Sequence, residues 1–243
     1  MARVAVIVPE ETDLLCEGCG YNLNNLPTTS NCPECGKPIE QSIGAHRHLS
    51  AFEVKPGIAS FIHTTIELLF RPKRFFRTIT TRNASASAKR FATIHSLIAT
   101  LLFTFAALGH FLWVMDISGN RANEASWSGP FALAALIVIG LSIFGLKRLA
   151  AWLSAIEGRY WGMRLPFPVV MRGLLFHTAH YLPVGLVAVA MVWGYRLLLM
   201  WRVLNHANDT IYLYSLCGAV IVSAVYLFNT YWIAMRSMMY ANR

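Results

Sequence analysis

Charged residues are scarce in this chain of 243 residues. Only 14% of them are Asp, Glu, Lys or Arg, whereas 56% are hydrophobic, and the mean hydropathy is +0.47. Soluble globular domains carry about 25% charged residues, so this composition is unlike that of an ordinary soluble domain. The sequence predicts an integral membrane protein.

Charge is missing altogether from four long apolar runs. A membrane-spanning helix needs about 20 consecutive apolar residues, and each run reaches that length. The predicted fold is therefore an all-α polytopic membrane protein whose transmembrane domain covers residues 91–243. We expect its four transmembrane helices at about 93–115, 127–146, 176–200 and 211–234.

A secretory signal peptide is also lacking. The apolar stretch at residues 3–8 is shorter than the core of such a peptide, and Pro9, Glu10 and Glu11 end it. We therefore expect the N-terminus to stay on the side of the membrane where it was made.

The basic residues give the expected orientation, because Lys and Arg are retained on the cytoplasmic side during insertion. Seven of them lie in 71–90 and five in 147–172, against one in 116–124. Both termini are predicted to be cytoplasmic, with the spans in the cell membrane. Because Pro166 and Pro168 interrupt any helix between spans two and three, we expect 157–173 to be a loop lying on the membrane. Re-entry of 147–172 into the membrane is the open alternative.

Residues 46–90 read as a basic amphipathic segment at the membrane surface. The order "GIASFIHTTIELLF" places apolar side chains on one face of a helix, and "RPKRFFRTITTR" alternates basic and aromatic residues. We expect the basic side chains to lie among anionic lipid headgroups while Phe75, Phe76 and Ile79 enter the acyl region. The alternative is a solvated basic linker. The apolar face is formed by Ile58, Phe61, Ile62, Ile66, Leu69 and Phe70.

Four of the five cysteines form two C-x2-C pairs, and each pair is followed by glycine. Tetrahedral zinc takes four thiolates, and a two-residue gap lets one tight turn supply two of them. Residues 1–45 are therefore predicted to be a small zinc ribbon that folds only with its metal. Iron is the rival metal, and disulfides are disfavoured because cytoplasmic thiols stay reduced. The predicted ligands are Cys16, Cys19, Cys32 and Cys35.

The charge of this ribbon excludes nucleic acid as its partner. Residues 16–40 carry Lys37 alone against Glu17, Glu34 and Glu40, and a four-thiolate zinc centre adds further negative charge. We expect a cytoplasmic protein partner instead. Tyr21, Leu23 and Leu26 form a small apolar group that either packs on the metal site or meets that partner.

Catalytic motifs are missing as well. The sequence has no H-E-x-x-H motif, no nucleophile elbow, no phosphate-binding loop and no dinucleotide fingerprint. The H-x-x-H pair of His177 and His180 lacks the glutamate that activates water in zinc proteases. We expect no enzymatic activity.

Histidines in the spans leave a redox function open. His95 and His110 lie about 22 Å apart along a helix with a rise of 1.5 Å per residue, a separation that suits two stacked haems. His177 and His180, at the start of span three, are the candidate opposing ligands. Alternatively, these histidines bridge helices by hydrogen bonds, as polar side chains in membrane bundles do.

Two short motifs resemble known families. The stretch from Cys16 to Gly36 resembles the "CxxCGYxLxxLP…CPECG" ribbon of bacterial multi-pass membrane proteins, and its two knuckles are similar to those of rubredoxins. "RPKRFF", through Pro72, Phe75 and Phe76, resembles the pre-membrane segment of the Yip family. The Yip resemblance implies a non-catalytic membrane scaffold with five spans, and the rubredoxin resemblance implies iron.

Three functions are compatible with these features. The first is a non-enzymatic membrane protein whose cytoplasmic zinc ribbon acts as a protein-docking or membrane-organising module. The second is a membrane redox protein with a four-thiolate iron site and haem. The third, a small transporter, rests only on Arg196 and the Pro183 and Gly185 break in span three.

Overall fold

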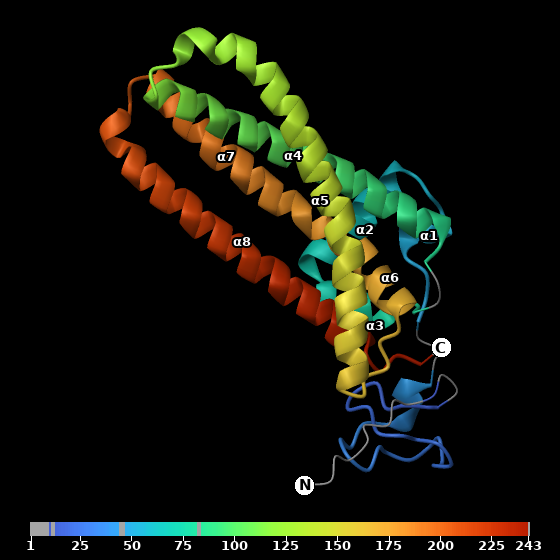
Figure 1. The fold of residues 1–243 in the computed structure, drawn as a ribbon. Helices are drawn as coiled ribbons and strands as arrows, with labels where there is room; N and C mark the ends of the chain where they lie inside the picture. The colour runs from blue at the N-terminus through green and yellow to red at the C-terminus, as the bar shows by residue number, and fades with distance from the viewer. Residues whose placement is uncertain (1–9, 11–12, 44–46, 82–83, 243) are drawn as a thin grey trace. The chain divides into compact units, whose positions relative to one another are not determined.

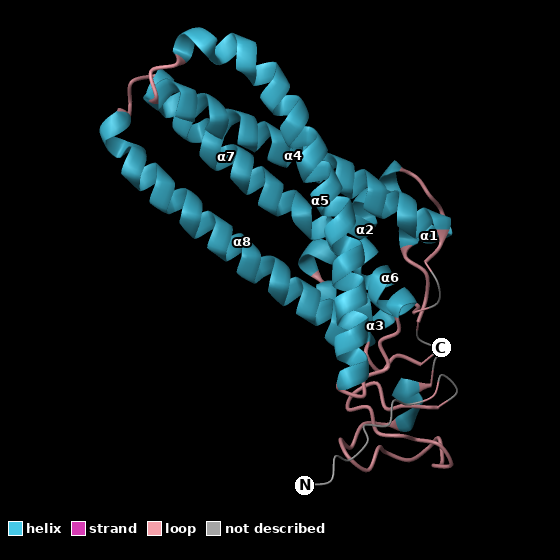
Figure 2. Cartoon of the chain, viewed as in Figure 1, coloured by secondary structure: helices cyan, strands magenta, loops and turns pink. Residues whose placement is uncertain are grey.

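The structure is a computed structural model that describes residues 10, 13–43, 47–81 and 84–242. Within these ranges every regular element is a helix, and a short loop-rich module precedes them (Figures 1 and 2). The predicted all-α fold class is confirmed.

Among the residues that the structure describes, four helical segments are long and apolar enough to cross a membrane, as predicted. The third is interrupted by one turn of 3-10 helix, η4 (Thr178–His180), between α6 and α7. The segments are α4 (Ala86–Ile117), α5 (Glu124–Tyr160), α6 (Phe167–His177) with α7 (Tyr181–Met200), and α8 (Asp209–Met238), which follows η5 (His206–Asn208).

The loop expected at 157–173 is shorter than predicted. Helix α5 continues to Tyr160, and α6 begins at Phe167. Pro168 does not prevent this start because it lies in the first turn of α6, where its missing N–H has no helical partner to lose. Only residues 161–166 connect the two helices.

The described chain forms two compact units. Unit 1 contains the N-terminal residues up to Ala92, the segment Lys147–His177 and the segment from Thr230 onwards. Unit 2 contains Thr93–Leu146 and Thr178–Asn229.

Unit 1 is built around a cluster of phenylalanines. The rings of Phe75 and Phe91 pack on Phe176 of α6, with centroids 5.1 and 5.5 Å away. Phe75, Phe76 and Ile79 are at most 2% exposed. The expectation that these three side chains enter the acyl region of the membrane is therefore wrong: α3 (Pro72–Thr78) turns its aromatic face toward the protein core.

Helix α2 (Ile58–Phe70) has the predicted amphipathic pattern and carries an outward-facing apolar stripe. The stripe residues follow one another at i, i+4, i+8 and i+12, so they share one face. The opposite face is buried and includes Thr64 and Leu68. The stripe consists of Ile58, Ile62, Ile66 and Phe70, whose exposed fractions are 82%, 51%, 52% and 78%.

A fully buried ion pair joins α6 to α1 (Ala51–Val54) in unit 1. Arg172 Nη2 lies 2.7 Å from each carboxylate oxygen of Glu53. Glu53 also closes a capping box with Ser50 at the start of α1 and accepts a hydrogen bond from Ser85. One carboxylate thus holds three chain segments together.

In unit 2, Asp209 at the start of α8 organises an aromatic cluster. Its carboxylate accepts hydrogen bonds from Trp113 Nε1 at 3.0 Å and from the Tyr195 hydroxyl at 2.6 Å. The Tyr195 ring stacks on Tyr212, with centroids 4.3 Å apart. These side chains tie the ends of α4, α7 and α8 together.

Candidate metal centre

The two C-x2-C pairs adopt the same turn. In the first, the Cys16 N–H donates to the carbonyl of Tyr21, and the Gly20 N–H donates back to the carbonyl of Cys16. Cys32 makes the equivalent bonds with the carbonyl of Lys37 and the N–H of Gly36. Each glycine has a positive φ, +83° at Gly20 and +71° at Gly36, in a region that side chains with a Cβ disfavour.

These turns bring all four sulfurs together. The four Sγ atoms lie within 4.8 Å of one another, with Cys16 3.4 Å from Cys35 and Cys19 3.6 Å from Cys32. A tetrahedral ion with metal–sulfur bonds of about 2.3 Å holds its sulfurs about 3.8 Å apart. The four cysteines are therefore positioned to bind one metal ion.

The electrostatics of the cluster favour a bound cation. Burial raises the pKa of Cys16, but hydrogen bonds from the N–H groups of Gly18 and Cys19 and from neighbouring thiols outweigh it and bring that pKa down from 9.0 to about 7. At Cys19, burial and the neighbouring thiols instead raise the pKa to about 12. The hydrogen bond from the N–H of Tyr21 acts in the opposite direction and lowers that pKa, but it is outweighed. Four thiols this close resist full ionisation, so a divalent ion supplies the charge that four thiolates need.

The small core around the cysteines is aliphatic. Cys16, Leu23, Cys32 and Ile39 are all at most 2% exposed, and Leu26 is partly buried against them. Two of the three residues in the predicted apolar group, Leu23 and Leu26, therefore pack on the site. The third, Tyr21, is 39% exposed.

The four-cysteine module (residues 13–43) is held by the residues that follow α8. Asn242 accepts a hydrogen bond from the N–H of Leu15 at 2.9 Å and donates to its carbonyl at 2.7 Å. It also donates to the carbonyl of Ser42. Asn242 is 6% exposed, so this side chain acts like a strand partner for the start of the module.

Two arginines reinforce this attachment. Arg47 forms a two-pronged ion pair with Glu17, both distances 2.9 Å, and donates to the carbonyls of Ile79 and Ser237. Arg164 donates to the carbonyls of Asp13 and Ala241 and to Asn242 Oδ1. Sequence reasoning missed these roles, because it used Arg164 only as a marker of topology and gave Arg47 and Asn242 no role.

At Gly20 the backbone of the four-cysteine module lies directly against the side chain of Tyr240. A Cβ at Gly20 would lie 2.6 Å from the ring of Tyr240, whereas a Cβ at Gly36 would meet nothing within 4 Å. The two cysteine turns are alike in conformation, but only the first is packed against the end of the chain.

Three of the four candidate histidines in the spans contact a hydroxyl group. His177 Nε2 lies 2.9 Å from Thr230 Oγ1 in unit 1. In unit 2, His180 Nδ1 lies 2.7 Å from the Tyr226 hydroxyl and His110 Nδ1 lies 2.9 Å from the Tyr212 hydroxyl. Such contacts are typical of polar side chains that bridge helices in membrane bundles. His95, the fourth candidate, is 2% exposed.

Two short sequence motifs of this chain resemble motifs of known protein families. The likeness of its cysteine pairs to zinc ribbons and rubredoxins and of "RPKRFF" to the Yip family stays a prediction. Comparison of the chain with protein-family models, with curated proteins and with solved structures finds no match.

Proposed function

We propose that the chain is a non-enzymatic integral membrane protein whose four-cysteine site binds one structural zinc ion. The zinc-loaded module serves as a rigid docking element for a cytoplasmic protein partner. The observation that carries this proposal is the attachment of the module through Asn242, Arg47 and Arg164, because it makes the metal site part of the same folded body as the membrane-proximal helices.

Zinc is inferred from the surroundings of the sulfurs. Cys16, Cys19, Cys32 and Cys35 would hold the ion, which neutralises the thiolates and locks both turns. The core packed on them is aliphatic, whereas the resemblance to rubredoxins would call for aromatic rings around the iron. Zinc has no redox chemistry of its own, which agrees with a structural role.

The hydrogen bonds between Leu15 and Asn242 support a shared side for both ends of the chain. Four helical segments able to span the membrane lie between these two residues. An even number of crossings returns the chain to the side where it started. The excess of Lys and Arg in 71–90 and 147–172 supports the cytoplasm as that side.

The exposed surface of the module points to a basic partner surface. Glu34 and Glu40 are exposed, and Tyr21 offers a half-exposed ring beside the first cysteine turn. An exposed tyrosine on a module that also exposes carboxylates can serve as an anchor for a protein with Lys or Arg at its interface.

Elemental analysis and a visible spectrum of detergent-purified protein test the metal. We expect one zinc per chain, no visible bands, and loss of zinc in Cys16→Ser with membrane insertion preserved. Bound iron or a Soret band would instead favour the redox alternative, with His95, His177 and His180 as the first residues to replace.

The docking role needs a separate test in cells. A photo-crosslinking amino acid in place of Tyr21 should give a discrete protein adduct that disappears in the Cys16→Ser chain. The same probe in place of Trp201, which is 70% exposed beyond the end of α7, is the control. Adducts from position 21 that survive loss of the metal site contradict the docking role.

A further inference from the structure

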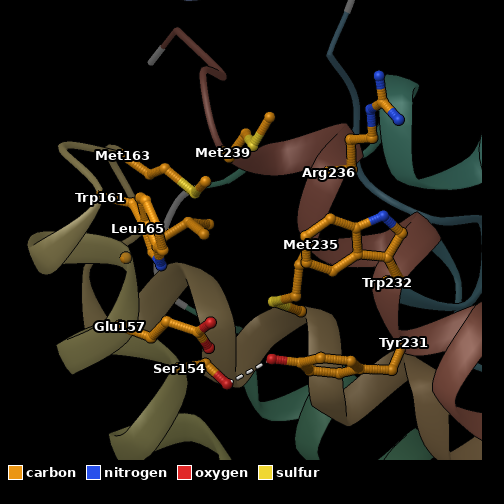
Figure 3. A pocket seen from close by; sticks show the side chains of 11 residues that line it. Ser154, Glu157, Trp161, Met163, Leu165, Tyr231, Trp232, Met235, Arg236 and Met239 are labelled. Atoms are coloured by element: carbon orange, nitrogen blue, oxygen red, sulfur yellow. Dashed lines mark hydrogen bonds between the residues drawn. The ribbon is translucent and has the colours of Figure 1, made fainter.

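A cavity of about 250 Å³ lies in unit 1, between the end of α5, residues 161–165 and the end of α8. Its wall is largely apolar, and three methionines and a leucine contribute flexible or aliphatic surface (Figure 3). Its floor is closed by a hydrogen bond of 2.5 Å between Ser154 Oγ and the Tyr231 hydroxyl. A site of this kind suits an apolar chain with a polar end.

Two charged residues line this cavity, Glu157 and Arg236, and they lie at different positions in it. Figure 3 shows the Glu157 carboxylate directed into the cavity beside Ser154, with Trp161 and Trp232 in opposite walls, whereas the Arg236 guanidinium lies at the rim and points away from the centre. A carboxylate in a cavity whose walls carry indole rings can attract an organic ammonium ion, through charge and cation–π attraction.

From this geometry we propose that the cavity binds a phospholipid whose headgroup carries an ammonium group, with that group at the Glu157 carboxylate and the acyl chains along the apolar wall. The ligand class follows from charge complementarity. An anionic headgroup would meet the Glu157 carboxylate, and a neutral apolar molecule would leave that carboxylate without a counterpart.

The position of the cavity agrees with this ligand. It lies at the ends of two helical segments that can span a membrane, Glu124–Tyr160 and His206–Met238. Trp161 and Trp232 are 63% and 48% exposed, as expected of tryptophans at headgroup level. Met163, Leu165, Met235 and Met239 can then contact the first carbons of the acyl chains.

Native mass spectrometry of the detergent-purified chain tests this inference. The protein is incubated with equal amounts of phosphatidylethanolamine and phosphatidylglycerol of matched chain length. We expect one ethanolamine lipid per chain to be retained, on the order of tenfold better than the glycerol lipid. Equal retention of the two lipids, or preference for the anionic one, overturns the proposal without any variant being needed.

Substitutions then locate the site. Glu157→Gln should abolish the preference for the ammonium lipid. The controls Glu40→Gln and Arg159→Gln replace exposed residues outside the cavity and should leave the preference intact. A preference that persists in Glu157→Gln also overturns the proposal. Zinc content is measured separately, so this result does not depend on the proposed function of the cysteines.

Discussion

Arg172 and Glu53 form an ion pair in which each side chain is only 1% exposed, although 119 residues separate them in the sequence. The guanidinium also lies 5.6 Å from the centre of the Phe176 ring. Because both side chains are buried, water cannot reach this pair to replace either partner.

Removing one partner of this pair should strongly destabilise unit 1. Arg172→Met leaves the Glu53 carboxylate buried, and we expect a loss of about 3–5 kcal/mol in the free energy of unfolding. Thermal unfolding in detergent measures the effect, with the exposed Arg159→Met as control. A double variant, Glu53→Gln with Arg172→Met, should lose less than the sum of the single losses, and strict additivity would argue against direct coupling.

Gly20 and Gly36 offer a matched pair for testing the attachment of the four-cysteine module. Alanine at either position costs about 1–2 kcal/mol in the left-handed region. Only Gly20→Ala should also displace Tyr240. We therefore expect tryptic cleavage after Arg47, whose side chain is 5% exposed, to accelerate more in Gly20→Ala than in Gly36→Ala. Equal acceleration in both variants would show that backbone strain alone opens the module.

Asn242→Ala should loosen the same attachment from the other side. The substitution leaves the N–H and carbonyl of Leu15 and the carbonyl of Ser42 without their partner, at a cost of about 1–3 kcal/mol. Faster cleavage after Arg47 is the expected result. Asn205→Ala, which removes a cap of η5 in unit 2, is the matched control and should not alter cleavage there.

Metal removal should unfold the module and spare the spanning helices. The core around Cys16 is too small to fold without its metal, so a chelator or Cys32→Ser should expose Arg47 to trypsin while helical circular dichroism falls only slightly. Cys217→Ser is the control, because Cys217 is exposed on α8 rather than placed at the cluster. Unchanged cleavage in the metal-free chain would contradict a structural role for the ion.

The apolar stripe of α2 should lie against lipid. In vesicles, a water-soluble maleimide should label Ile62→Cys more slowly than His63→Cys, although both positions are exposed in the protein. Peptide mass spectrometry reads the two positions separately from the native cysteines. Similar rates would place the stripe in water.

The predicted spans and the cysteine cluster depend on local patterns, which is why sequence reasoning found them. A run such as 127–146 has few alternatives to a membrane helix, and two C-x2-C pairs need only short turns to meet. The helix 58–70 was predictable for the same reason. Its pattern did not reveal that Phe75 and Phe76 belong to the protein core, because periodicity does not distinguish a lipid neighbour from a protein neighbour.

The attachment of the module was not predictable from the sequence. Arg47, Arg164 and Asn242 lie outside any recognisable motif, and most of their partners are backbone carbonyls, which every residue possesses. Contacts between residues 15 and 242 appear only when the helices between them are placed.

That same contact sets an order of events during synthesis. The ribosome completes the cysteine turns long before it reaches Asn242, so the module can capture a metal while the helices are still being made. Arg47 and Arg164 obtain the carbonyls of Ser237 and Ala241 only after α8 is in place. A nascent chain that fails to insert α8 would therefore carry a loose module with Arg47 open to proteases, a mark by which unfinished copies can be recognised and removed.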